Sequence, residues 1–438
     1  MTTLHKTGGQ TPGTPRGLIL SAPASGSGKT TITLGILRAL ARRGFFVRSA
    51  KSGPDYIDPR FHAAASGRDC VNLDAWAMTP ERLVSLAAGD GLLLIEGAMG
   101  LFDGAPPDGQ GATADLARHL GLPVVLVLDC ARQSQSIAAL VRGFQTHRAE
   151  IRIVGLILNN VGSPRHEEML RRALDETGLP VIGALARDPG MAHPARHLGL
   201  VQAAEHADLE RFLNRAGDHV ATSLDLALLQ SLATPLPVAP EADRPHLPPP
   251  AQRIAIASDQ AFAFAYPHLL ADWRKAGAVI TFFSPLQNQA PPEADLILLP
   301  GGYPELHAGR IAAATTFING LKKASYSTDI YGECGGYMVM GSGLIDAAGK
   351  HHEMAGLLAL ETSFAHPRLH LGYRRLRAEG GVFPGCYRGH EFHYATTLMA
   401  RGEPLFQAFD AADTPLAPMG LIHGRCSGSF AHLIDREP

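Results

Sequence analysis

The chain has 438 residues, more than the roughly 100–200 residues of an ordinary domain, which indicates at least two domains. Its formal net charge is −2 and its apolar runs fall far short of the roughly 18 residues of a membrane span, which excludes nucleic-acid-binding and membrane proteins. Five cysteines without a C-x-x-C pair argue against a disulfide framework and a zinc site. We expect a cytoplasmic protein with small-molecule ligands.

Proline divides the chain into parts. Residues 234–250 contain seven prolines, which rule out a continuous helix or a central strand there. We expect residues 1–16 to be a flexible leader, residues 17–233 a first domain, residues 234–250 a linker and residues 251–438 a second domain.

Short apolar runs alternate with helical patterns on both sides of this linker. The expected strands before it are residues 17–21, 45–50, 92–95, 123–128 and 153–158, and those after it are residues 253–257, 278–283, 295–299 and 329–331. Such alternation is typical of a mostly parallel sheet with helices on both faces. The sequence therefore predicts two α/β domains.

A glycine-rich loop follows the first expected strand and precedes a helix-compatible run. It reads Gly-Lys-Thr-Thr at its end, although Pro23 stands where the common phosphate-binding pattern begins with glycine. In such a loop, backbone N–H groups and the lysine bind phosphates and the threonine ligates Mg²⁺. A Gly/Ser turn with a surface lysine, the alternative, does not explain why strand, loop and helix coincide. We predict an ATP and Mg²⁺ site made by Ser25, Gly26, Ser27, Gly28, Lys29, Thr30 and Thr31.

Three acidic residues lie at or after the ends of later expected strands. Glu96 closes an apolar run, which places it at the carboxyl edge of the sheet, where open α/β sheets bind ligands. Asp103 follows in a glycine-rich stretch, and Asp129 ends another run, where a cap or turn role is an equal alternative. We predict that Glu96 and Thr30 hold the metal ion.

Residues 51–59 combine charge with rigid backbone. Lys51, Asp55, Tyr56 and Asp58 occur there with a glycine and two prolines, directly after the second expected strand. No packing requirement explains this combination. We expect a turn that presents Lys51, Asp55 and Asp58 over the phosphates, with Asp55 as a further metal ligand; a solvated surface turn is the alternative.

Cys334 lies between an expected strand and a pair of glycines. Small neighbours allow a sharp strand-to-helix turn that exposes the sulfur and brings helix N–H groups close to it, as in a nucleophile elbow. A buried structural cysteine is the ordinary alternative, but no other cysteine here has glycines in this arrangement. We predict that Cys334 is a catalytic nucleophile.

A thiolate nucleophile needs a base, and the chain has 20 histidines. His432 is the best placed, because a cysteine followed about a hundred residues later by a histidine matches the order of Cys-His amidases. His423, His390 and His393 are the competing candidates.

Two further glycines end another expected strand. Gly301 and Gly302 have backbone N–H groups suited to an oxyanion hole, and we expect Gly335 to join them; an ordinary glycine turn is the alternative.

Taken together, these motifs resemble the cobyrinic acid and hydrogenobyrinic acid a,c-diamide synthase family, and the likeness covers the whole chain. The first half is also similar to dethiobiotin synthetase, and the second half to class I glutamine amidotransferases. The motifs that carry the resemblance are residues 24–31, 51–59, 96–104, 300–305 and 332–336 and His432.

This resemblance implies an ATP- and glutamine-dependent carbon–nitrogen ligase. It would amidate the a and c acetate carboxylates of hydrogenobyrinic acid or cobyrinic acid in cobalamin biosynthesis, with Mg²⁺ as cofactor. In family terms, Asp55, Tyr56, Asp58 and Asp103 correspond to positions for corrinoid binding and amidation. A homodimer is left open.

One position departs from the class I amidotransferases. These proteins have a glutamate two residues after the catalytic histidine, where this chain has Ile434. The related corrinoid enzymes are similar in lacking that glutamate, so the resemblance implies a Cys334–His432 dyad, and Asp435 is not assigned to the gap.

Two other functions stay open at this stage. A cobyric acid synthase would amidate other carboxylates of the corrin ring, but that family looks different over residues 51–59. A ParA-like ATPase switch would bind partners or membranes without synthesis, and the amidase half of the chain argues against it.

Overall fold

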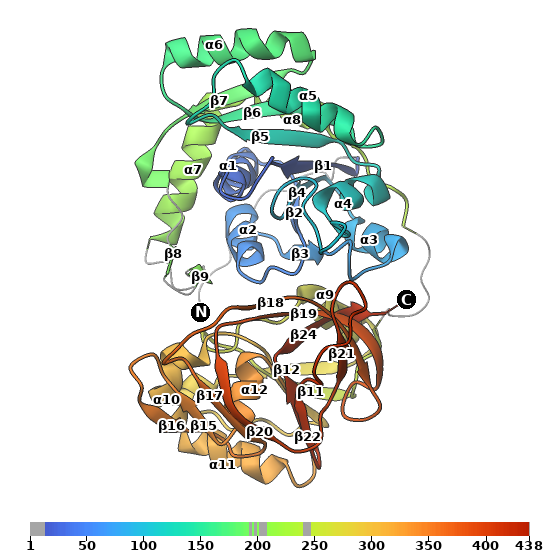
Figure 1. Ribbon diagram of the computed structural model, residues 1–438, viewed down its shortest axis with the longest axis vertical. Helices are drawn as coiled ribbons and strands as arrows, with labels where there is room; N and C mark the ends of the chain where they lie inside the picture. Colours follow the sequence, from blue (N-terminus) through green and yellow to red (C-terminus); the bar gives the residue numbers. More distant parts are fainter. Residues whose placement is uncertain (1–13, 192–194, 197–198, 201–207, 240–246, 438) are drawn as a thin grey trace. The chain divides into compact units, whose positions relative to one another are not determined.

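The computed structural model describes residues 14–191, 195–196, 199–200, 208–239 and 247–437 (Figure 1). The chain divides into two compact units. The first comprises the residues up to 104 and residues 109–240, and the second comprises residues 105–108 and 241–438.

The first unit is built on one large sheet in the order β3-β2-β4-β1-β5-β6-β7, in which all these strands run parallel. β10 (Thr234–Pro235) pairs with the start of β1 in the antiparallel direction. The parallel strands are β1 (Arg16–Ser21), β2 (Val47–Ser52), β3 (Cys70–Leu73), β4 (Leu92–Glu96), β5 (Val124–Asp129), β6 (Ile153–Val161) and β7 (Val181–Ala186); β8 (Ala195–Arg196) and β9 (Gly199–Leu200) form a separate pair.

Helices cover both faces of this sheet. Figure 1 shows α1, α2 and α7 on one face and α3, α4 and α5 on the other. Since helices cover both faces, the central strands are mostly apolar, and Leu18, Ile19 and Leu20 of β1 are fully buried. The helices are α1 (Lys29–Arg42), α2 (Asp58–Ser66), α3 (Pro80–Ala87), α4 (Thr113–Leu120), α5 (Ile137–His147), α6 (Pro164–Leu174), α7 (Leu209–Ser223) and α8 (Leu226–Leu232).

The second unit has a six-stranded sheet in the order β12-β11-β13-β14-β23-β22. Its strands run parallel except β22, which pairs antiparallel with β23. They are β11 (Arg253–Ala257), β12 (Val279–Phe283), β13 (Leu296–Leu299), β14 (Asp329–Glu333), β22 (Leu421–His423) and β23 (Cys426–Ser429), with helices α9 (Pro267–Lys275), α10 (Ala308–Ala312), α11 (Thr315–Ala324) and α12 (Gly335–Met340).

Two four-stranded sheets complete the second unit, in the orders β16-β15-β17-β20 and β21-β18-β19-β24. The second of these is antiparallel and carries the C-terminal strand. Their strands are β15 (Gly343–Ile345), β16 (His351–Glu353), β17 (Ala359–Ser363), β18 (His370–Ala378), β19 (Gly385–His393), β20 (Thr396–Arg401), β21 (Gln407–Phe409) and β24 (Ala431–Arg436).

The expected fold class is confirmed, because both units are α/β and the first contains a parallel sheet behind a glycine-rich loop. The two four-stranded sheets of the second unit were not anticipated. The division into leader, domains and linker stays a prediction, since residues 1–13 and 240–246 lie outside the described residues. Arg16 already belongs to β1, and Thr234 and Pro235 form β10.

Two further features concern the cysteines and the length of the helices. All five cysteines carry free thiols. Among the described residues, no helix combines the length and apolar character needed to cross a membrane.

Helix α12 packs so closely on β13 that its second residue must be glycine. A Cβ atom on Gly336 would lie 1.9 Å from the carbonyl oxygen of Leu299, which is backbone and cannot turn aside. The whole helix is buried. The close approach sets the position of the turn that precedes α12.

We therefore expect Gly336→Ala to destabilise the second unit by about 1–3 kcal/mol, because an overpacked core must shift its backbone. Thermal unfolding of the purified chain measures this. Gly143→Ala is the matched control, since Gly143 lies exposed inside α5 with nothing near its added methyl group. A Gly336→Ala protein that melts with the wild type would contradict the packing argument.

Candidate functional site

A pocket of about 670 Å³ lies at the carboxyl edge of the first unit's sheet. The glycine-rich loop between β1 and α1 forms one wall, and the ends of β2 and β4 form another. Gly28 ends the loop with φ at +89°, and a Cβ there would lie 2.2 Å from Nδ2 of Asn159. Only glycine therefore fits at this start of α1.

Lys29 begins α1 and lies largely buried in this pocket. Its Nζ donates hydrogen bonds to the carbonyl oxygens of Met99 (2.6 Å) and Ala24 (3.3 Å). Burial lowers the pKa of Lys29, although the Glu96 carboxylate opposes that effect. The expected phosphate-binding lysine thus points into the loop that surrounds the pocket.

Glu96 is the centre of a buried polar network. Its Oε1 accepts hydrogen bonds from Oγ1 of Thr30 (2.5 Å) and Nζ of Lys51 (2.8 Å), and its Oε2 lies 2.6 Å from Nε2 of His62. Burial alone would raise the pKa of Glu96, but Lys51 and His62 outweigh it and lower the pKa. The carboxylate is therefore held ionised.

Lys51 neutralises a second carboxylate as well. Its Nζ lies 2.6 Å from Oδ2 of Asp58, and the Lys51 side chain is 6% exposed. Burial lowers the pKa of Lys51, but Asp58 and Glu96 outweigh it and raise the pKa. The expectation that Lys51 lies on a turn was wrong, because it belongs to β2 and is the register partner of Glu96 in β4.

Two aspartates lie differently from what the sequence predicted. Oδ1 of Asp55 accepts the backbone N–H groups of Ile57 (2.7 Å) and Asp58 (3.1 Å), where the chain enters α2. Burial raises the pKa of Asp55 to about 7, and Asp58 adds to the rise. It is Asp58 whose Oδ2 lies 3.4 Å from Oγ1 of Thr30. Asp58, rather than Asp55, therefore stands beside Thr30 and Glu96.

His62 is a member of the network that the sequence did not reveal. It lies one helical turn after Asp58 on α2 and is completely buried. Burial lowers the pKa of His62, but Cys70 and Glu96 outweigh it and raise the pKa to about 10. The only signal in the sequence was the i, i+4 spacing from Asp58, which puts both side chains on one helix face.

The two other candidate aspartates lie at or after strand ends: Asp129 is the last residue of β5, and Asp103 lies in the loop after β4. Oδ2 of Asp103 accepts the N–H of Gly100 (2.9 Å) in the loop after β4. Oδ1 of Asp129 accepts hydrogen bonds from Ala131 N–H (3.2 Å) and Nδ2 of Asn160 (2.9 Å), as the turn alternative predicted.

The pocket extends beyond the phosphate loop to the ends of β6 and β7. Asn159 and Asn160 close β6, and Nδ2 of Asn159 donates a hydrogen bond to the carbonyl oxygen of Ser27 (2.9 Å). Sequence reasoning missed both residues. The signal that could have found them was two polar side chains at the end of an apolar strand.

In the second unit, Cys334 occupies the turn between β14 and α12. Its φ of +46° and ψ of −104° are unusual for a residue with a side chain, so the backbone there is strained, as in a nucleophile elbow. Its N–H donates a hydrogen bond to the carbonyl oxygen of Ser429 (2.8 Å). Burial raises the pKa of the Cys334 thiol, and Glu305 adds to the rise.

His432 meets Cys334 over Gly301. A Cβ on Gly301 would lie 2.4 Å from Cε1 of His432 and 3.3 Å from Cβ of Cys334. His432 lies on β24 opposite His390 of β19, and burial lowers its pKa to about 3, so the imidazole is neutral. The structure thus brings together the predicted nucleophile and base.

The expected oxyanion glycines also lie together. A Cβ on Gly335 would be 3.1 Å from the backbone nitrogen of Gly302, and one on Gly302 would be 2.1 Å from the carbonyl oxygen of Ala261. Both positions therefore require glycine, and the N–H of Gly335 is close enough to Cys334 to favour its thiolate.

Two of the competing histidines, His423 and His390, differ in burial. His423 is exposed on β22. Nδ1 of His390 lies 3.4 Å from the hydroxyl oxygen of Tyr266, and burial lowers the pKa of His390 well below its usual value.

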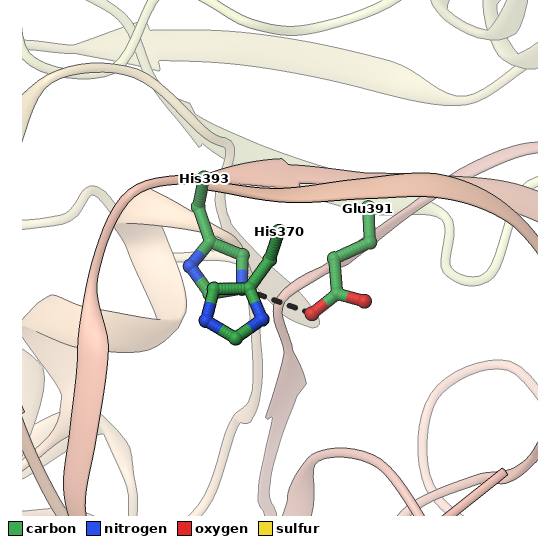
Figure 2. A group of neighbouring side chains, drawn as sticks. All are labelled: His370, Glu391 and His393. Carbon is green, nitrogen blue, oxygen red and sulfur yellow. Dashed lines mark hydrogen bonds and ion pairs between the residues drawn. The ribbon is translucent and has the colours of Figure 1, made fainter. Parts of the chain in front are cut away.

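His393 belongs to a group with His370 and Glu391, whose ligand atoms lie within 4.8 Å of one another (Figure 2). The two imidazole rings are stacked, with centroids 4.6 Å apart and planes 7° apart. Glu391 contacts His393 (2.9 Å) and also pairs with Arg374 (2.7 Å). An imidazole binds a metal in its own ring plane, and one ion cannot lie in two parallel planes. Within the group, a hydrogen bond joins Glu391 and His393, and His370 contributes by stacking on His393.

Two matches to known families agree with these sites. Residues 18–201 match the CobQ/CobB/MinD/ParA nucleotide binding domain, and residues 253–437 match the CobB/CobQ-like glutamine amidotransferase domain. Fold and sites together define a glutamine amidotransferase joined to a nucleotide-binding domain.

Full-length relatives refine this class. Over 96% of this chain, it is 55% identical to the hydrogenobyrinate a,c-diamide synthase of Brucella abortus, covering 98% of that protein. It is 54% identical, again over 96% of this chain, to the proteins of the same name from Rhizobium meliloti and Rhodobacter capsulatus, covering 99% of each. The chain belongs to the hydrogenobyrinate a,c-diamide synthase family, which confirms the resemblance found in the sequence.

Lys51→Met tests the buried charge network. It leaves Asp58 and Glu96 in the interior without their shared cation, so we expect a loss of about 3–5 kcal/mol in the free energy of unfolding at pH 7.5. The loss should shrink at pH 5.5, because a buried carboxylate that loses a neutralising cation takes up a proton more readily as the pH falls; Glu96 keeps its contact with His62. Thermal unfolding at both pH values measures this.

Lys350→Met, which removes an exposed lysine, is the control for that experiment. A Lys51→Met protein that unfolds like this control, or one that loses more stability at pH 5.5 than at pH 7.5, would contradict the network.

Gly301→Ala tests the meeting of Cys334 and His432. The added methyl group would displace the imidazole, so we expect glutamine hydrolysis to fall at least about 100-fold, as misplaced catalytic groups commonly cause. Ammonia release from glutamine is the measurement. Gly380→Ala is the control, because its Cβ would meet nothing closer than 4.0 Å. Equal rates for the two variants would show that Gly301 does not separate a catalytic pair.

Proposed function

We propose that the chain catalyses the ATP- and glutamine-dependent amidation of the a and c acetate carboxylates of hydrogenobyrinic acid, a step of cobalamin biosynthesis. The observation that carries this proposal is the full-length likeness to proteins named for that product, in a chain that keeps both a phosphate-binding loop and a Cys–His pair. No observation favours the cobyric acid or ParA-like alternatives.

The nucleotide pocket of the first unit would take ATP with Mg²⁺. Thr30, Glu96 and Asp58 offer oxygen ligands of the kind that Mg²⁺ prefers. Oδ1 of Asp58 fits this role, because it is buried without a hydrogen-bond partner among the described residues. The ion would neutralise phosphate charge when bound. Asn159 and Asn160 lie where the nucleoside would extend from the phosphate loop.

ATP is needed because a carboxylate is a poor electrophile. Its oxygen attacks the γ-phosphorus, ADP leaves, and the resulting acyl phosphate carries a good leaving group for attack by ammonia. Lys29 and Lys51 would stabilise the charge during phosphoryl transfer, a step that depends mainly on positioning and electrostatics. The product amide forms as phosphate departs.

The corrinoid carboxylate has to reach the same edge of the sheet. Asp55 and Tyr56 follow β2 and Asp103 follows β4, and these neighbouring strands end together. The loops that carry them are therefore suited to contact the substrate, as the family resemblance implies.

The second unit would supply the ammonia. Cys334 gives its proton to His432 and attacks the side-chain amide carbon of glutamine, while N–H groups of Gly302 and Gly335 stabilise the oxyanion. His432 then protonates the departing nitrogen, and ammonia leaves a γ-glutamyl thioester. Water, deprotonated by His432, hydrolyses the thioester to glutamate.

Cys334→Ser tests the division of labour between the units. We expect glutamine-dependent amidation to fall at least about 100-fold, because a serine hydroxyl is a far weaker nucleophile, while amidation with ammonium salt persists. Mass spectrometry of hydrogenobyrinic acid after reaction reports the replacement of carboxyl oxygens by nitrogen.

Cys386→Ser, at a half-buried cysteine outside this site, is the matched control. The proposal fails if the wild-type chain amidates hydrogenobyrinic acid with neither nitrogen source. The assignment of Cys334 fails if its variant uses glutamine as well as the control does.

A further inference from the structure

We propose that Glu333, the residue before the nucleophile, is the positioning residue of His432: its carboxylate orients the imidazole and balances the charge that forms on it during glutamine hydrolysis. The inference rests on the proposed function and extends it. Ile434 stands where other class I amidotransferases have a glutamate, and Glu333 would supply the missing carboxylate from a different strand.

The geometry places Glu333 on the correct side of the ring. The Cβ position of Gly301, which borders Cys334, lies 2.4 Å from Cε1 and 3.2 Å from Nε2 of His432. The opposite nitrogen, Nδ1, lies 3.6 Å from Oε2 of Glu333. A carboxylate at Nδ1 favours the tautomer with its proton there, so that the lone pair on Nε2 can accept the thiol proton.

The carboxylate is itself held in place. Oε1 of Glu333 accepts the backbone N–H of Leu433 (3.1 Å), so the side chain links the end of β14 to β24 directly beside His432. Its side chain is 12% exposed, and it lines a small, mainly apolar cavity with Trp273 and Phe383. Little water competes for the carboxylate, and the 3.6 Å separation would shorten once the imidazole carries a charge.

The ionisation of Glu333 offers a direct readout. Burial raises the pKa of Glu333 to about 8, although the Leu433 N–H and Tyr331 oppose the rise. The groups facing the pair are Tyr331 and Cys334, next to Glu333, and His390, Glu391 and His393 on β19. Burial raises the pKa of Cys334 and lowers that of His432 to about 3. Burial would raise the pKa of Glu391, but His393 outweighs it and lowers this pKa to about 2.

The protonation of Glu333 determines how the rate of glutamine hydrolysis should depend on pH. A protonated Glu333 cannot accept the Nδ1 proton, so kcat/KM for glutamine hydrolysis should rise as the pH passes through about 8 and fall below it. A purely structural Glu333, which only binds the Leu433 N–H, would give no such dependence.

Glu333→Gln separates the two roles. The amide keeps the shape of the side chain and an oxygen for the Leu433 N–H, but it carries no charge. We expect kcat for glutamine hydrolysis to fall about 10- to 100-fold with KM nearly unchanged, and the rise in rate near pH 8 to disappear. Amidation with ammonium salt should continue at the wild-type rate.

The experiment measures ammonia release between pH 6 and 9 for the wild type, Glu333→Gln and Glu353→Gln, whose glutamate is exposed on β16. A fall in kcat of less than about fivefold relative to Glu353→Gln overturns the proposal. If Glu333→Gln does not fold, the wild-type profile decides, because a rate that is flat across pH 8 also overturns it. A wild type that hydrolyses glutamine but amidates no corrinoid would refute the proposed function and leave this test intact.

Discussion

The parallel pairing of strands is the constraint on which the rest of the molecule depends. When strands run the same way, their carboxyl ends and the loops that follow them meet at one edge. In the first unit this brings Lys51 of β2 into register with Glu96 of β4, beside the phosphate loop after β1. In the second unit the same rule places Cys334 at the end of β14, next to the glycines that follow β13.

Each site contains a feature that would cost free energy in isolation, and the surrounding residues stabilise it. Ionised Glu96 is completely buried, but Lys51, His62 and Thr30 provide its hydrogen bonds and counter-charge. The strained backbone of Cys334 persists because α12 is fixed by its close approach to β13. The positions of the reactive side chains in each unit therefore depend on the close packing around them. A substitution of a nearby glycine affects both catalysis and stability.

The sequence predicted those features that follow from local order along the chain. Lys29 and Thr30 follow a strand and open a helix, and Cys334 precedes two glycines, so their surroundings could be inferred from a few neighbours. Long-range contacts were less accessible. His62 reaches Glu96 across 34 positions and Glu333 reaches Leu433 across 100; the spacing from Asp58 places His62 on the same helix face but does not identify Glu96 as its partner. That Asp58 rather than Asp55 lies beside Thr30 depends on how the chain folds at the start of α2, which the turn residues alone do not specify.

The burial of Cys334 also has a consequence for the lifetime of the protein in an oxidising cell. Peroxide attacks the thiolate and scarcely reacts with the neutral thiol, so a cysteine that stays protonated at rest is protected from conversion to sulfenic acid. Burial, to which the nearby Glu305 carboxylate adds, keeps the proton on the Cys334 sulfur until substrate and base act together. The buried environment that keeps the thiol protonated thus also protects the nucleophile from oxidation between turnovers.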